Sequence, residues 1–163
     1  MASSVLQSRE MNSCYNVRFL SALLATLLIV AGIWGCGSKV PFGIVPVHGK
    51  VVYEDGSLIP ADNILLTFNP ILSGEKSKMV PPGGRTNVNV QDGTFSAVSS
   101  YRKDDGLAIG RHKAMVVAYK NGPNGSSTPS TEVPAIYNKE ATTPLEVEVE
   151  SSDQFIEIKV SKK

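Results

Sequence analysis

The distribution of apolar residues divides the chain into two parts with different patterns. Phe19 to Trp34 is a continuous apolar run, which only Ser21 and Thr26 interrupt. From Val47 onwards, short segments alternate apolar and polar residues, and clusters of Gly, Pro, Asn and Asp separate these segments. Alternation with a period of two is typical of strands with one buried face, whereas the N-terminal run is typical of an export signal or a membrane segment.

The alternating segments predict an all-β domain. The expected strands are residues 47–53, 63–69, 85–90, 94–99, 111–120, 145–150 and 154–160. We expect hairpins at Gln91-Asp92-Gly93 and between the last two strands, because Gly supplies the positive φ of tight turns. Residues 111–120 are apolar on both faces and are therefore predicted to be a central strand, with Tyr119 facing the core. Residues 135–140 are expected to form one helical turn.

This spacing of strands favours a seven-stranded Greek-key β-sandwich, and a small barrel is the alternative. The expected organisation is a signal helix within residues 1–35, a tether at 36–46 and the sandwich at 47–163. Two long loops, residues 70–84 and 121–134, are rich in Gly, Pro, Ser and Asn, and the second is predicted to be the more mobile.

The N-terminal run has the organisation of a secretory signal, with Arg9 and Arg18 before an apolar stretch slightly shorter than the ~20 residues of a transmembrane helix. Its last residues, Ile33-Trp34-Gly35-Cys36, resemble the bacterial lipobox. The resemblance implies cleavage before Cys36 and acylation of that cysteine, which places the protein in the cell envelope. Trp34 departs from the small residue usual there, and an uncleaved membrane anchor is the alternative.

Composition narrows the function further. Residues 1–35 contain two arginines and one glutamate, so the remaining chain has equal numbers of basic and acidic residues. A nucleic-acid-binding protein normally has a basic excess, and we therefore expect no nucleic-acid partner. Cys14 lies in the signal and Cys36 is the expected acylation site, which leaves the domain without a disulfide or a thiol nucleophile. Either Met1 or Met11 is an acceptable start.

Three motifs of the domain resemble those of bacterial lipoproteins with a transthyretin-like, carboxypeptidase-regulatory-like domain. They are the Gly-x-Val…Asp-Gly opening at 49–60, Asp-Gly-Thr-Phe-Ser at 92–96, and Ile-Gly-Arg-His-Lys at 109–113. Ile109 departs from the proline usual at that position. The resemblance implies a seven-stranded sandwich of the prealbumin type and does not imply an activity, since such domains usually serve as stability, adhesion or scaffold modules.

The polar residues do not form a recognisable catalytic or metal motif. His48 and His112 are the two histidines, and both are expected on the surface, where they lack a third ligand for a metal. The aspartates before glycines are expected to form turns rather than a calcium site. A hydrolase on the transthyretin fold ends in Tyr-Arg-Gly-Ser, whereas this chain ends in Val-Ser-Lys-Lys. We therefore predict no enzyme activity, no cofactor and no metal.

The remaining candidates concern partner binding. Glu146, Glu148 and Glu150 predict an acidic strip that is either a solvated strand face or a docking site for a basic partner. Tyr101 and Tyr137 are expected to be exposed loop aromatics. The predicted function is a lipid-anchored envelope protein with a non-catalytic structural or protein-interaction domain. The alternative is a glycan, peptide or small-ligand site in loops 70–84 and 121–134. The partner, the membrane and the oligomeric state are left open.

Overall fold

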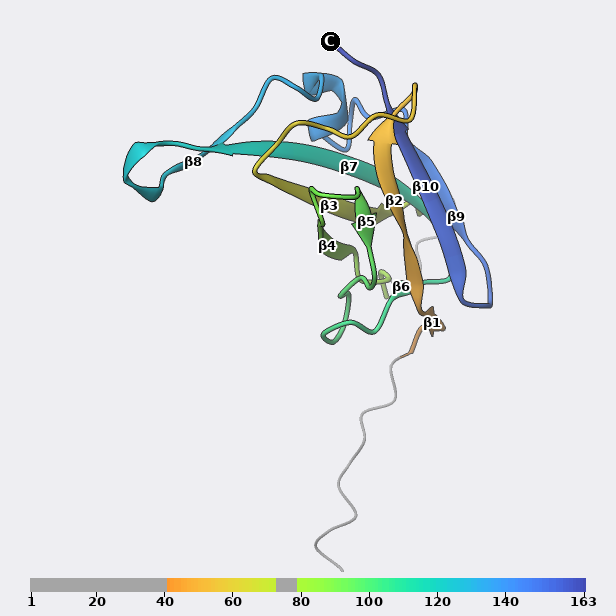
Figure 1. The fold of residues 1–163 in the computed structure, drawn as a ribbon. Coiled ribbons are helices and arrows are strands. Elements are labelled where there is room, and N and C mark those ends of the chain that lie inside the picture. The colour runs from red at the N-terminus through yellow and green to blue at the C-terminus, as the bar shows by residue number, and fades with distance from the viewer. Residues whose placement is uncertain (1–40, 73–78) are drawn as a thin grey trace, which may run out of the picture. The chain divides into compact units, whose positions relative to one another are not determined.

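The computed structural model describes residues 41–72 and 79–163, and all structural statements below refer to them. The predicted signal peptide, the lipobox with Cys36 and most of the predicted tether lie outside the described residues. Strands make up 45% of the described residues and short helical turns 6%, which confirms the all-β class (Figure 1). Within this part of the chain, no helix has the length and apolarity needed to cross a membrane.

Ten strands and two 3-10 turns make up the described part of the chain. The strands are β1 (Ile44–Val45), β2 (Val47–Tyr53), β3 (Asn63–Pro70), β4 (Gly84–Val88), β5 (Thr94–Phe95), β6 (Leu107–Ala108), β7 (Gly110–Asn121), β8 (Ser127–Pro129), β9 (Glu146–Val149) and β10 (Gln154–Val160). The turns are η1 (Pro123–Gly125) and η2 (Ala135–Asn138). η2 confirms the predicted helical turn, and β1 lies inside the predicted tether.

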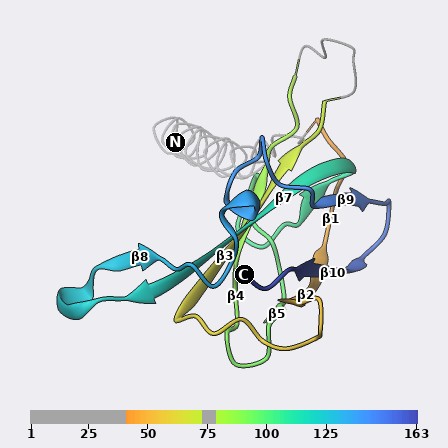
Figure 2. The same cartoon turned by 90° about the horizontal axis from the view of Figure 1, so that it is seen from above.

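The strands form open sheets. One sheet has the order β10-β2-β5, and a second has the order β4-β3-β7-β8, with β9 also paired to β7. β1 and β6 form a separate two-stranded pair. β7 pairs with β3, β8 and β9, which confirms its central position. At one end of the second sheet, the hairpin of β7 and β8 extends away from the rest of the domain in both views (Figure 1 and Figure 2).

The predicted hairpin between the last two strands is wrong. β9 pairs with β7, whereas β10 runs parallel to β2 from the pair Gln154–Val47 to the pair Val160–Tyr53. The chain crosses from one sheet to the other between β9 and β10. Alternation along each strand determines which side chains face the core, but it does not determine which neighbouring strand supplies the backbone partners.

The predicted turn at residues 91–93 forms, but its two arms do not pair with each other as a hairpin. The Asn89 N–H donates to the Thr94 carbonyl oxygen at 2.8 Å, and the Gly93 N–H donates to the Asn89 carbonyl oxygen at 2.8 Å. Its two arms then separate, because β4 joins β3 and β5 joins β2. The two arms meet again at one isolated bridge between Arg85 and Ser99.

Both larger sheets contribute to one hydrophobic core. The rings of Phe68 on β3 and Phe95 on β5 have centroids 6.4 Å apart. On β7, Ala114, Val116 and Ala118 are buried, whereas Tyr119 is half-buried on the opposite face. The expectation that Tyr119 faces the core is therefore wrong. The inward side of β7 uses its small residues, which leave space for the large side chains of β3.

Candidate functional site

The structure separates the residues that the sequence grouped as a potential interaction surface. Tyr101 is 53% exposed in the loop before β6, as expected. Tyr137 is 7% exposed, so the prediction that it is an exposed aromatic is wrong. Its ring packs into the core from η2, and its hydroxyl lies 3.1 Å from the Ser161 hydroxyl and accepts the Ser161 N–H at 3.1 Å.

The acidic strip is partly neutralised by the neighbouring strand. Glu146 pairs with Arg111 and, at 2.9 Å, with Lys113, both on β7. Hydrogen bonds from Lys113 and then from Arg111 lower the pKa of Glu146. Glu148 lies opposite Arg111 in the ladder, and Glu150 follows the end of β9. The strip is thus one side of an acidic and basic surface, which reduces its attraction for a basic partner.

The two histidines have different environments, and the prediction that both lie on the surface fails for one of them. His112 is 1% exposed on the core face of β7, where its Nε2 lies 2.7 Å from the Ala108 carbonyl oxygen. Burial lowers the pKa of His112, although the hydrogen bond to Ala108 opposes this effect. His48 is partly exposed on β2, and its Nδ1 lies 3.3 Å from Asp153. In residues 41–72 and 79–163, no group of His, Cys, Asp and Glu side chains is arranged to hold a metal.

The segment directly after β5 is open on both sides. Ser96 and Ala97 have no hydrogen-bond partner within the described residues. Val98 then accepts the Gly106 N–H at 2.8 Å, and Ser99 returns to Arg85. Between the two points of contact, this segment has one residue more than β4. It therefore bulges, and Ser96 and Ala97 bond neither to β2 on one side nor to β4 on the other.

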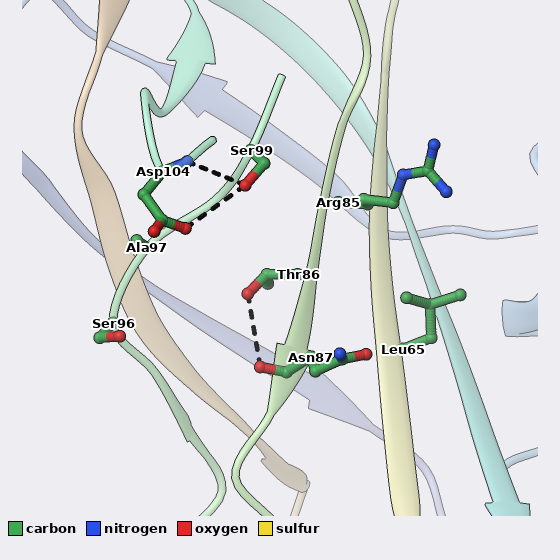
Figure 3. Close-up of a pocket in the computed structure, with 8 residues that line it drawn as sticks. All are labelled: Leu65, Arg85, Thr86, Asn87, Ser96, Ala97, Ser99 and Asp104. Carbon is green, nitrogen blue, oxygen red and sulfur yellow. Dashed lines mark hydrogen bonds between the residues drawn. The ribbon is translucent and has the colours of Figure 1, made fainter. Parts of the chain in front are cut away.

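A cleft lies on each side of this bulge. The β4 cleft, with a volume of about 470 Å³, is lined by Leu65, Arg85, Thr86, Asn87, Ser96, Ala97, Ser99 and Asp104 (Figure 3). The β2 cleft, of about 190 Å³, is lined by Pro46, Val47, His48, Ser96, Ala97, Val98, Asp104, Gly106 and Asp153. Ser96, Ala97 and Asp104 line both clefts. The larger volume falls within the range of ~300–1,000 Å³ that is typical of ligand sites.

One wall of the β4 cleft presents backbone groups of an edge strand. In an antiparallel pair, only alternate residues exchange hydrogen bonds with a given neighbour. The N–H and C=O of Arg85 both bond to Ser99, at 2.9 and 3.0 Å, so they point away from β3. Asn87 lies two residues further along β4 and points the same way. Its N–H has no partner within the described residues, and its carbonyl oxygen accepts only the Thr86 hydroxyl, at 3.3 Å.

The opposite wall is held by a loop that wraps around the Asp105 carboxylate. The Asp105 carboxylate accepts the backbone N–H groups of Ser100, Tyr101 and Arg102 at 2.8, 3.1 and 2.7 Å. Burial raises the pKa of Asp105, but these hydrogen bonds outweigh burial and leave the pKa below its ordinary value. Next to it, the Asp104 N–H donates to the Ser99 hydroxyl at 2.9 Å. The loop thereby positions Asp104 between the two clefts.

Sequence reasoning did not identify the cleft residues. Arg85 and Asn87 are predicted as ordinary strand residues and Asp104 lies between the predicted strands, whereas the bulge depends on the number of residues between two distant contacts. No local motif encodes that number. The exposure of Phe155, in contrast, can be predicted from the alternation of its strand. It shares the outward face of β10 with Glu157 and Lys159, so the alternation already places an aromatic ring in solvent.

No family model, curated protein or solved structure matches this chain. The lipobox and the transthyretin-like motifs therefore stay predictions from the sequence.

Proposed function

We propose that this chain is a lipid-anchored protein of the cell envelope whose β-domain acts as a non-catalytic protein-interaction module. The lipobox at 33–36 supports the anchor, with Cys36 as the acylated residue. The observation that favours partner binding is the β4 cleft, in which Asn87 presents backbone groups without a backbone partner in the described residues to a space large enough for a ligand. Unpaired polar groups of this kind gain hydrogen bonds when a partner docks.

The arrangement of the polar side chains favours binding over catalysis. Ser96 and His48 both line the β2 cleft, and His48 is next to Asp153. A nucleophile and its base need a hydrogen bond between them, whereas no hydrogen bond joins Ser96 to His48 in the described residues. The Ser99 hydroxyl is engaged by the Asp104 N–H and supports the loop.

The finer fold assignment also belongs to this proposal. Two sheets that contribute to one core, with Phe68 against Phe95, support a β-sandwich. Alternation of partners between sheets, as in the step from β9 to β10, is a property of Greek-key connections. We assign the domain to the transthyretin-like type on the motifs at 49–60 and 92–96.

The anchor is tested by the intact mass of the protein extracted from membranes, together with analysis of its N-terminal peptide. We expect a chain that begins at Cys36 with diacylglyceryl and acyl mass, and we expect Cys36→Ala to lack both the added mass and the cleavage. An unmodified chain that retains residues 19–34 would show a membrane anchor in place of the lipid.

The interaction is tested by a photo-crosslinking amino acid introduced at Ala97 in intact cells. The control carries the same group at Glu157, on the outward face of β10. We expect a discrete adduct with one envelope protein from position 97 only. Equal labelling at the two positions, or none at position 97, would contradict a partner site at the clefts.

A second candidate function is the binding of a glycan or small ligand near loop 121–134. A third cleft, of about 290 Å³, is lined by Pro129, Ser130, Thr131, Val133, Pro134, Ala135, Asn138 and Lys163. The Oδ1 atom of Asn138 is buried and has no partner within the described residues, so a ligand donor would satisfy it. A glycan array probed with the intact protein and with Asn138→Ala tests this candidate. Binding that the substitution abolishes would support it.

A further inference from the structure

We propose that the β4 cleft binds an extended peptide segment of the partner protein, which adds to β4 by main-chain hydrogen bonds to Asn87. This inference rests on the proposed interaction function and names the kind of partner that it takes. Addition of a strand to an open sheet edge is a general mode of peptide recognition, in which the backbone provides affinity and neighbouring side chains provide specificity.

The open backbone groups of Asn87 lie on the edge of β4 that borders the cleft. Hydrogen-bonded pairs along an antiparallel edge recur every two residues. Arg85 on β4 bonds to Ser99, and Asn89, directly after the end of β4, bonds to Thr94 and Gly93. The groups of Asn87 lie between these two occupied positions and have no backbone partner in the part of the chain that the structure describes. One pair of bonds is therefore missing from an otherwise continuous edge.

The wall of the cleft that faces β4 also presents backbone groups. Ser96 and Ala97 lie across the cleft, and their backbone groups also lack partners within residues 41–72 and 79–163. An extended peptide carries N–H and C=O groups along both of its edges, so one segment can bond to Asn87 on one side and to this wall on the other. Leu65 is half-buried, pairs with Asn87 in the ladder and lines the same cleft. It offers an apolar contact to a peptide side chain.

A peptide and a second copy of the domain differ in the space that they need at this edge. The open part of β4 is a single residue, flanked by the bonded residues Arg85 and Asn89. A second folded domain would have to bring a complete edge strand into this short gap. A single extended segment of another protein is narrower than a folded domain and needs only one residue to reach Asn87 through the cleft. The geometry therefore favours a flexible segment of a partner.

The test uses the full-length protein in detergent and a displayed library of heptapeptides as the probe. Asn87→Pro removes the open N–H. Proline is tolerated on edge strands, and the pair Asn87–Leu65 contributes no ladder hydrogen bond by the alternation described above. Asn87→Ala is the matched control, because it removes the side chain and keeps the N–H. We expect selected peptides to bind Asn87→Pro about tenfold more weakly and Asn87→Ala as tightly as the parent.

A second measurement leaves the protein unchanged and so does not depend on the folding of Asn87→Pro. Each amide of a selected peptide is N-methylated in turn, and we expect methylation at one position to weaken binding about tenfold. Failure to select any peptide, or binding that is insensitive to both changes, would overturn strand addition. Self-association that Asn87→Pro abolishes would overturn the peptide as the occupant and assign the edge to a second copy. A crosslink at Ala97 combined with any of these results would leave the interaction module in place and remove only the peptide mode.

Discussion

The side-chain amide of Gln154 bonds to the backbone of Glu148 across the corner between the two larger sheets. Its Nε2 donates to the Glu148 carbonyl oxygen at 3.0 Å, and its Oε1 accepts the Glu150 N–H at 3.0 Å. β9 and β10 belong to different sheets, so no backbone ladder joins them. The carboxamide of Gln154 takes the place of one pair of ladder bonds and holds the crossing chain against the end of β9.

Replacement of Gln154 by alanine should therefore destabilise the domain. A side chain that makes two hydrogen bonds to backbone contributes about 0.5–1.5 kcal/mol for each, so we expect the free energy of unfolding to fall by about 1–2 kcal/mol. Urea unfolding followed by circular dichroism measures the change. Ser152→Ala, on an exposed bend of the same turn, is the control and should change the value by less than about 0.5 kcal/mol. Equal effects of the two substitutions would show that the corner bonds contribute nothing.

The same corner shows where sequence reasoning stops. The alternation in residues 154–160 predicts that Ile156 and Ile158 face the core, and both are buried. It does not predict that β10 pairs with β2, because the partner lies about a hundred residues earlier and any open edge would accept the pattern. His112 is a different case. It shares its face of β7 with Ala114 and Val116, so the alternation already contained its burial, which its polar character concealed.

The clefts illustrate a second limit. The bulge at Ser96–Ala97 arises because two chain segments with unequal numbers of residues join the same two contacts. Turn motifs such as Asp92-Gly93 predict where each segment begins, but they do not predict that Ser99 returns to Arg85. The Asp105 loop holds the residues directly after Ser99, and its hydrogen bonds form only once the backbone is folded. A site built from open backbone groups has no side-chain signature in the sequence.

Stability should depend on pH through His112. Its pKa in the folded state lies below the unfolded value of about 6.5, mainly because of burial. Between these two values the unfolded chain binds more protons than the folded one, so stability rises with pH in this window. The full stability is thus present above about pH 6.5 and is lost progressively as the pH falls below it. Urea unfolding at several pH values between 5 and 8 measures this dependence.

The control for this prediction replaces the imidazole by a ring of similar shape. His112→Phe removes the titrating group, and we expect the loss of stability below about pH 6.5 to become smaller. His48→Asn removes the second histidine, which is partly exposed and next to Asp153, and should leave the loss in place. If His112→Phe retains the whole pH dependence, other groups are responsible for it.

Gly49 is required by the close approach of its neighbours in the three-stranded sheet. A Cβ atom at this position would lie 1.9 Å from the Ile156 carbonyl oxygen and 2.9 Å from the Phe95 ring. Because the first contact is with backbone, β2 and β10 would have to separate. We expect Gly49→Ala to lower the free energy of unfolding by about 3 kcal/mol or more. Gly122→Ala is the control, because its Cβ would meet the movable Ser126 hydroxyl at 2.7 Å and backbone only at 3.5 Å, an ordinary contact distance; a similar result for both would contradict the close packing.

Two phenylalanines on opposite sides of the fold provide a test of the sheet faces. Phe68 is 0% exposed and packs against Phe95, whereas Phe155 is 60% exposed beside the His48 ring. Phe68→Ala should cost about 3–5 kcal/mol, because it removes a buried ring and leaves a cavity. Phe155→Ala should change the free energy of unfolding by less than about 0.5 kcal/mol, since its ring already contacts water. Denaturant unfolding of both variants gives the comparison. A large loss at Phe155 would mean that β10 faces the core by its other side, which would shift its register against β2 by one residue.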